Sequence, residues 1–159
     1  MVDIHELQSL PLFQELPVAQ FDALLKNLRP LSLEEDELLV EEGVTTRAPL
    51  FLIVEGELEV SRKDDAGVSR HITTLIPPTV VGEVEFLTDL PASATVRALS
   101  EVRGKLLPRE RFEAMFIEGD PWAHYLALAI GRVVSKRLHD TNKLLIGARS
   151  SGVERARSP

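Results

Sequence analysis

The stretch PLFLIVEGELEV, residues 49–60, constrains the fold of this 159-residue chain more than any other segment. Its first half is an unbroken apolar run from Leu50 to Val54, which predicts a core strand. Gly56 then interrupts the run, and Leu58 and Val60 alternate with glutamates, a pattern typical of a strand with one buried face. The segment therefore predicts two successive strands of a β-rich core.

Further short strands are predicted from about residue 31 to residue 107. KDDAG, residues 63–67, is typical of a hairpin turn, and alternating apolar residues on either side predict the strands that it joins. Two more alternating segments follow, at 96–98 and 102–106. Many short antiparallel strands at this spacing favour a sandwich, a jelly roll or a similar roll.

Helices are predicted on both sides of this β-region, at 3–28 as a pair, at 109–116, and from Pro121 onward. Asp120 suits the N-cap of the last helix, and Pro121 suits its first turn. We expect one domain over residues 1–146, with N-terminal helices at about 3–28, a β-roll at about 31–107 and later helices at about 109–146. Residues 147–159 have few apolar side chains and are expected to form a flexible tail.

Composition excludes several kinds of chemistry. The chain has no cysteine, which rules out disulfides, thiol catalysis and Cys-based zinc sites and fits a cytoplasmic protein. No apolar run approaches the roughly 20 residues of a membrane span, and the N-terminus lacks a signal-peptide pattern. Net charge is −12 over residues 1–102, from 7 Lys/Arg and 19 Asp/Glu, so nucleic-acid binding by this part is disfavoured.

The sequence offers no catalytic or metal-binding constellation. Its four histidines are scattered, and Ser93 has no evident His and Asp partners. The acidic run EEDE at residues 34–37 lacks the glycine that a calcium loop needs at its sharp turn. We therefore expect a protein that is not an enzyme and that has no metal site or tightly held cofactor.

The order of helix, β-roll and long helix, with glycines at Gly43, Gly56 and Gly82, resembles the cyclic nucleotide-binding domain family. This family includes the cAMP receptor protein and its relatives, protein kinase A regulatory subunits and nucleotide-gated channels. The resemblance implies a mainly β fold with flanking helices, a double-stranded β-helix or jelly-roll-like β-roll. It covers about residues 8–145, through the segments LPLFQELP, LLVEEG, PLFLIVEGELEV, LPRERFEAMF and GEVEFLTDLPASATVRA.

The last of these segments resembles the family's phosphate-binding cassette. The resemblance implies that Glu83 accepts a hydrogen bond from the ribose and that an arginine pairs with the cyclic phosphate. Here the arginine position falls on Ala92, and Glu85 adds a negative charge close by, so weak affinity for cAMP or cGMP is expected. The expected ligand-binding residues are Gly82, Glu83, Val84, Ala92, Ser93 and Thr95.

The long helix carries an apolar stripe that can be divided into two adjacent seams. The resemblance implies a homodimer through this helix, and Arg137 and Thr141 as residues that cap the bound ligand. One seam would cover the roll and the other a second subunit, although both seams could instead pack on the roll. The expected dimerisation residues are Leu126, Ile130, Val133, Val134, Leu138 and Leu145.

Three functions follow from these patterns. The first is a regulatory sensor that couples occupancy of its pocket to the position of the C-terminal helix and so to a protein partner. The second is a ligand-independent pseudo-domain that serves dimerisation or another protein interaction. The third is a fragment of a DNA-binding regulator, but no helix-turn-helix pattern follows the long helix.

Overall fold

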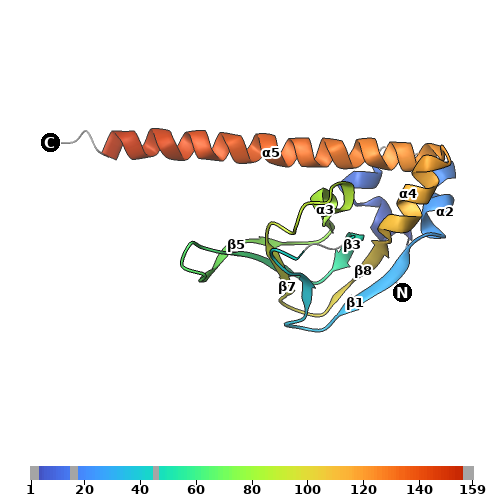
Figure 1. The fold of residues 1–159 in the computed structure, drawn as a ribbon, viewed down its shortest axis with the longest axis horizontal. Helices are drawn as coiled ribbons and strands as arrows, with labels where there is room; N and C mark the ends of the chain where they lie inside the picture. Colours follow the sequence, from blue (N-terminus) through green and yellow to red (C-terminus); the bar gives the residue numbers. More distant parts are fainter. Residues whose placement is uncertain (1–3, 15–17, 45–46, 156–159) are drawn as a thin grey trace.

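A computed structural model describes residues 4–14, 18–44 and 47–155 of the chain, without the side chains of residues 4, 18–20, 22 and 144–155. Two antiparallel sheets lie below one long helix (Figure 1). One sheet has the strand order β1-β8-β3-β6 and the other the order β2-β7-β4-β5. The strands are β1 Arg29–Leu33, β2 Leu38–Val40, β3 Leu50–Glu55, β4 Leu58–Lys63, β5 Ser69–Leu75, β6 Thr79–Val81, β7 Thr95–Ala98 and β8 Val102–Leu107.

The predicted mainly β class with flanking helices is confirmed. The helices are α1 Ile4–Gln8, the 3-10 turn η1 Pro11–Phe13, α2 Val18–Leu25, α3 Glu83–Leu87, α4 Arg109–Ile117 and α5 Pro121–Arg155. Asp120 caps α5 as predicted, because its side chain accepts a hydrogen bond from the Trp122 N–H at 3.2 Å. The helix continues to Arg155, whereas the sequence predicts a flexible tail from residue 147.

Strand β3 shows why its sequence is apolar without interruption. Successive side chains of a strand point to opposite faces, and both faces of β3 are covered. Leu50 and Leu52 pack among the helices, whereas Phe51 and Ile53 pack between the two sheets. The second cluster also holds side chains from four other strands, namely Leu58, Val81, Val96, Ala98 and Val102.

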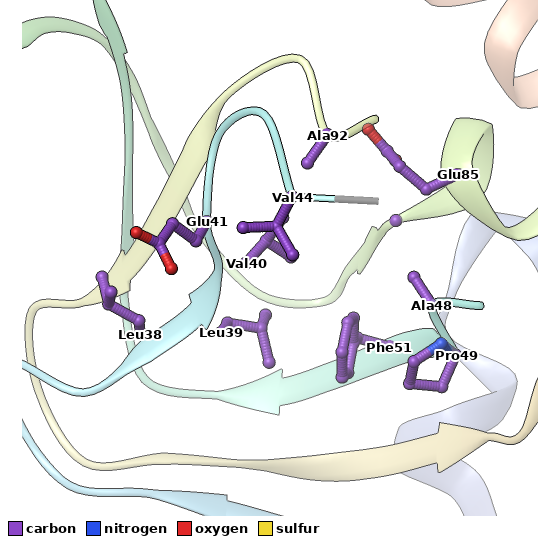
Figure 2. Close-up of a pocket in the computed structure, with 11 residues that line it drawn as sticks. Leu38, Leu39, Val40, Glu41, Val44, Ala48, Pro49, Phe51, Glu85 and Ala92 are labelled. Atoms are coloured by element: carbon purple, nitrogen blue, oxygen red, sulfur yellow. The ribbon is translucent and has the colours of Figure 1, made fainter. Parts of the chain in front are cut away.

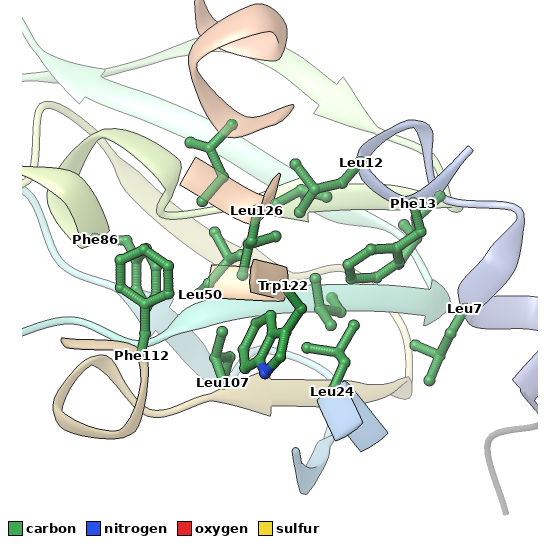
Figure 3. Packing of buried hydrophobic residues seen from close by; sticks show 14 of the residues in the cluster. Leu7, Leu12, Phe13, Leu24, Leu50, Phe86, Leu107, Phe112, Trp122 and Leu126 are labelled. Atoms are coloured by element: carbon green, nitrogen blue, oxygen red, sulfur yellow. The ribbon is translucent and has the colours of Figure 1, made fainter. Parts of the chain in front are cut away.

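The larger core lies between the first sheet and the helices. Trp122, at the start of α5, is fully buried there beside Leu24 of α2 and Leu107 of β8 (Figure 3). Phe86 of α3 and Phe112 of α4 pack against each other in the same core, with ring centroids 4.9 Å apart. The base of α5 and both neighbouring helices are therefore held by one hydrophobic cluster.

Two of the expected dimerisation residues belong to this core. Leu126 and Ile130 are 1% and 0% exposed and pack inside the protomer. The expectation that they form a dimer surface is therefore wrong, because a side chain already buried in its own subunit has no surface to offer. Val133 and Val134 pack partly against the same cluster, while Leu138 is 61% exposed, and the Leu145 side chain lies outside the described residues.

Candidate functional site

The candidate site is built around the turn that joins β6 to α3. Gly82 occupies this turn with φ of +83°, a left-handed conformation that side chains with a Cβ rarely adopt. A Cβ there would also lie 3.2 Å from the Pro49 carbonyl oxygen. Glycine therefore lets the chain turn sharply from β6, so that Glu83 begins α3 next to the sheet.

Glu83 is held by a residue from the far end of the chain. Its buried carboxylate forms an ion pair with the Arg137 guanidinium of α5, and Arg137 Nη2 donates a second hydrogen bond to the Val80 carbonyl oxygen at 3.1 Å. Partial burial lowers the pKa of Arg137 from its ordinary value, because desolvation disfavours the charged form. The pair connects α5 directly to the segment that carries the predicted site.

Two cavities adjoin this segment. The α5-side cavity, of about 280 Å³, lies below Arg137, and the loop-side cavity, of about 320 Å³, lies below the loop after β2 (Figure 2 shows the latter). Val40, Gly82 and Glu85 border both of them. The α5-side cavity is otherwise lined by Val60, Thr73, Leu75, Val80, Val81, Glu83, Val84, Ser93, Ala94, Val96 and Arg137.

Five of the predicted site residues line the α5-side cavity, namely Gly82, Glu83, Val84, Ser93 and Arg137. Ala92 does not line it and instead borders the loop-side cavity, where its side chain is 6% exposed. Its backbone is engaged by the loop after β2, because Ala92 N–H donates to the Val44 carbonyl at 3.1 Å and Gly43 N–H donates to the Ala92 carbonyl at 2.8 Å. The predicted arginine position is therefore on the wall between the cassette and that loop.

Two predicted residues contact neither cavity. The Thr95 hydroxyl accepts a hydrogen bond from the Glu42 N–H at 3.0 Å and so serves the pairing of β7 with the segment after β2. The Thr141 hydroxyl donates to the Arg137 carbonyl at 2.9 Å, four residues back along α5, and its side chain is exposed. Neither hydroxyl faces a cavity in this arrangement.

Most of the apolar lining was not predicted. Val40, Val60, Leu75 and Val96 come from four strands of the second sheet. The strand register brings them together, because Val96 lies opposite Val40 on one side and Val60 on the other. Their alternation along each strand was readable in the sequence, but alternation marks a buried face without indicating a cavity. Arg109 was also missed: it is 8% exposed and donates to the Thr88 carbonyl at 2.7 Å, which supports the end of α3 from below.

The electrostatics of the site are dominated by carboxylates. Among the residues that line the two cavities, the acidic ones are Glu41, Glu83 and Glu85, and the basic one is Arg137. Among the described residues there is no group of three or more His, Cys, Asp or Glu that could hold a metal ion. The arrangement can hold a small, mostly apolar molecule through a few polar contacts, with α5 passing beside it.

An antiparallel β-roll with such a cavity next to its C-terminal helix defines a class of small-molecule-binding regulatory domain. The model of the cyclic nucleotide-binding domain family matches residues 30–133, well over half of the chain. The protein therefore belongs to the cyclic nucleotide-binding domain family, as its sequence resemblance implied.

Curated relatives include regulatory proteins and an acetyltransferase of Mycolicibacterium smegmatis. The chain is 29% identical over 109 residues to a cAMP-dependent protein kinase regulatory subunit of Yarrowia lipolytica, covering 69% of this chain and 28% of that protein. It is 23% identical over 134 residues to a CRP-like cAMP-activated global transcriptional regulator of Mycobacterium tuberculosis, covering 84% of this chain and 58% of that protein. The chain thus spans less than two thirds of the length of either relative.

Solved structures confirm the fold. A cyclic nucleotide-binding domain from Methylobacillus flagellatus superimposes with a TM-score of 0.79 at 16% identity, over 91% of this chain and 81% of that one. In the part of the chain that the structure describes, no helix combines the length and the apolar character needed to cross a membrane.

Proposed function

We propose that this chain is a non-catalytic regulatory sensor module in which occupancy of the α5-side cavity is coupled to the position of α5. The observation that carries the proposal is the contact of Arg137 with Glu83 and with the Val80 carbonyl, because it ties the helix to the wall of the cavity. Beyond the body of the roll, α5 continues alone (Figure 1). A small rotation of the helix at Arg137 therefore displaces its far end by a larger distance.

Coupling requires that a ligand interact differently with the two positions of the helix. A ligand that donates a hydrogen bond to Glu83 competes with Arg137 for the same carboxylate, whereas one that contacts both residues holds them together. Either outcome changes how firmly α5 rests on α3. The core residues at the base of α5, such as Trp122, stay fixed and provide the pivot.

Cyclic nucleotides are proposed as weak ligands of this cavity. The relatives named above are described as cAMP-dependent or cAMP-activated. Ala92 supplies no charge for the phosphate, and Arg137 is already engaged by Glu83. Loss of one partner of a buried charge pair weakens binding by roughly 30-fold to several thousandfold.

The test combines titration calorimetry with hydrogen exchange. We expect cAMP and cGMP to bind weakly to the wild-type chain, and saturation to change amide exchange within residues 126–143 of α5. Ala92→Arg should strengthen cAMP binding, since the two cavities meet close to that position. Binding that leaves α5 exchange unchanged would contradict the proposed coupling, whatever its affinity.

A protein partner and a homodimer through α5 are the proposed outputs of the module. Leu128 and Leu138 are 55% and 61% exposed on this helix, which leaves apolar surface for a second helix. Sedimentation velocity should show a dimer that Leu138→Glu weakens and that Lys136→Glu, at a neighbouring exposed position, leaves intact. A monomeric wild-type chain at high concentration contradicts the homodimer.

The alternative is a ligand-independent interaction module. It is favoured by the exposed apolar residues Phe116 and Ile117 of α4, which are 41% and 85% exposed. In this case assembly depends on the helices alone, and neither cyclic nucleotide changes the oligomeric state or the α5 exchange. Any nucleotide-dependent change in either measurement excludes this alternative.

A further inference from the structure

The wall shared by the two cavities carries the negative charge of a glutamate, Glu85. Glu85 borders both cavities, and its side chain is only partly exposed. Its Oε1 atom accepts a hydrogen bond from the Ser93 N–H at 3.3 Å. The Glu85 carboxylate therefore accepts the hydrogen bond that the Ser93 N–H could otherwise donate to a ligand. It lies next to the neutral side chain of Ala92 (Figure 2).

Two neighbouring polar groups are also engaged within the chain. The Ala92 N–H donates to the Val44 carbonyl, and the Thr95 hydroxyl oxygen accepts a hydrogen bond from the Glu42 N–H. Arg137, the basic residue among the described lining residues, is paired with Glu83. Among the described residues no cation pairs with the Glu85 carboxylate, while Arg109 Nη1 donates to Glu85 only at its backbone carbonyl, at 3.4 Å, so the lining keeps a negative excess.

An anionic group placed here meets repulsion from the Glu85 carboxylate. Like charges in a partly desolvated site disfavour each other strongly, and a phosphate stripped of water needs several donors to compensate. An uncharged molecule that donates hydrogen bonds is not repelled, and the second carboxylate oxygen of Glu85 can accept one of its hydrogen bonds. The valine and leucine side chains of the α5-side cavity supply apolar contact for a flat ring.

We propose that Glu85 acts as a built-in anion that replaces the ligand phosphate, so that the cavity selects an uncharged, hydrogen-bond-donating molecule of the nucleoside class over a cyclic nucleotide. This rests on the proposed function, since the ligand keeps the base and ribose but lacks the phosphate. Selectivity resides in a single carboxylate on the wall between the two cavities.

Adenosine and cAMP form a matched pair of probes, because they share base and sugar and differ in the cyclic phosphate. In calorimetric titrations of the wild-type chain we expect adenosine to bind at least about tenfold more tightly than cAMP. Glu85→Gln keeps the size of the side chain and removes its charge. This variant should raise cAMP affinity by about tenfold or more while changing adenosine affinity by less than about threefold.

Glu35→Gln is the matched control, because Glu35 is an exposed carboxylate that lines neither cavity. It removes one negative charge as well and should leave the adenosine-to-cAMP ratio within about twofold of the wild-type value. Equal shifts in the two variants would mean a general charge effect and would overturn the assignment to Glu85.

Three other results also overturn the proposal: cAMP binding as tight as adenosine in the wild type, a ratio unchanged by Glu85→Gln, or no binding of adenosine at millimolar concentration. The readout is the affinity ratio alone, whereas the proposed function is judged by α5 exchange. Adenosine selectivity without a response of α5 supports the ligand class and contradicts the coupling. Tight cAMP binding with a change in α5 exchange supports the coupling and contradicts the proposed ligand class.

Discussion

Arg137 and Glu83 lie 54 residues apart in the chain and form an ion pair that joins α5 to the first turn of α3. The glutamate side chain is 9% exposed and the arginine 46%, so the contact is buried at one end and open at the other. A pair of this kind holds two elements together and can still be reached by a competing group. It is the physical link between the candidate cavity and the helix that leaves the domain.

Arg137→Ala should loosen α5 and destabilise the domain by about 1–2 kcal/mol, because it leaves a buried carboxylate without its partner. Urea unfolding measures the loss, and amide exchange should rise in the second half of α5. Lys136→Ala removes a neighbouring exposed charge and should have little effect on either quantity. Adding Glu83→Gln to Arg137→Ala should recover part of the stability; a further loss would contradict this account.

Arg109→Ala should destabilise the segment that follows α3. The guanidinium donates to the Thr88 carbonyl and forms ion pairs with Asp89 at 3.0 Å and Glu113 at 2.8 Å, and its own side chain is 10% exposed. We expect a loss of about 1–2 kcal/mol in unfolding experiments, since the Thr88 carbonyl loses its hydrogen-bond donor and two partly or fully exposed carboxylates lose their ion-pair partner.

Arg111→Ala is the control for that variant, because Arg111 lies on the same helix with its side chain exposed. Its effect should stay within about 0.5 kcal/mol. Equal destabilisation by the two variants would mean that helix charge, and not the contact with α3, is responsible.

Gly104→Ala should destabilise the first sheet by about 1–3 kcal/mol or more. A Cβ at residue 104 would lie 2.1 Å from the Leu52 carbonyl oxygen, a backbone atom that cannot move without disturbing β3. Gly131→Ala on α5 is the matched control, because a Cβ there meets nothing within 4 Å. It should be neutral or stabilise the helix by up to about 1 kcal/mol, and thermal unfolding of both variants checks the contrast.

Acid should weaken the domain partly through Glu59. The Arg97 side chain lowers the pKa of Glu59 below its ordinary value of 4.5, with a smaller contribution from His71. A carboxylate with a lowered folded-state pKa stabilises the fold above the unfolded pKa, and this stability is lost as the pH falls through the lowered value.

Arg97→Gln should therefore reduce the difference in stability between about pH 7 and about pH 3.5, as measured by urea unfolding at each pH. Arg62→Gln serves for comparison, because Arg62 is exposed and its ion pair with Glu42 is longer, at 3.6 Å. An acid response that is the same in wild type and Arg97→Gln would show that other carboxylates cause it.

Much of the architecture could be predicted because its signals are local. The apolar run of β3 reflects burial on both faces, and the Asp120 cap marks the start of α5. Gly82 in the predicted cassette has the positive φ that favours glycine. Each of these depends on the period of a single element or on the geometry of one turn, so a linear sequence contains it.

Contacts between elements were decided by the tertiary structure. The stripe on α5 identified Leu126 and Ile130 as apolar, but only packing shows that the roll covers them and leaves Leu138 exposed. The cassette pattern marked Ala92, but its place on the loop-side wall follows from hydrogen bonds to residues 43 and 44. Sequence periodicity specifies which face of an element is apolar, whereas the partner of that face depends on how distant segments pack together.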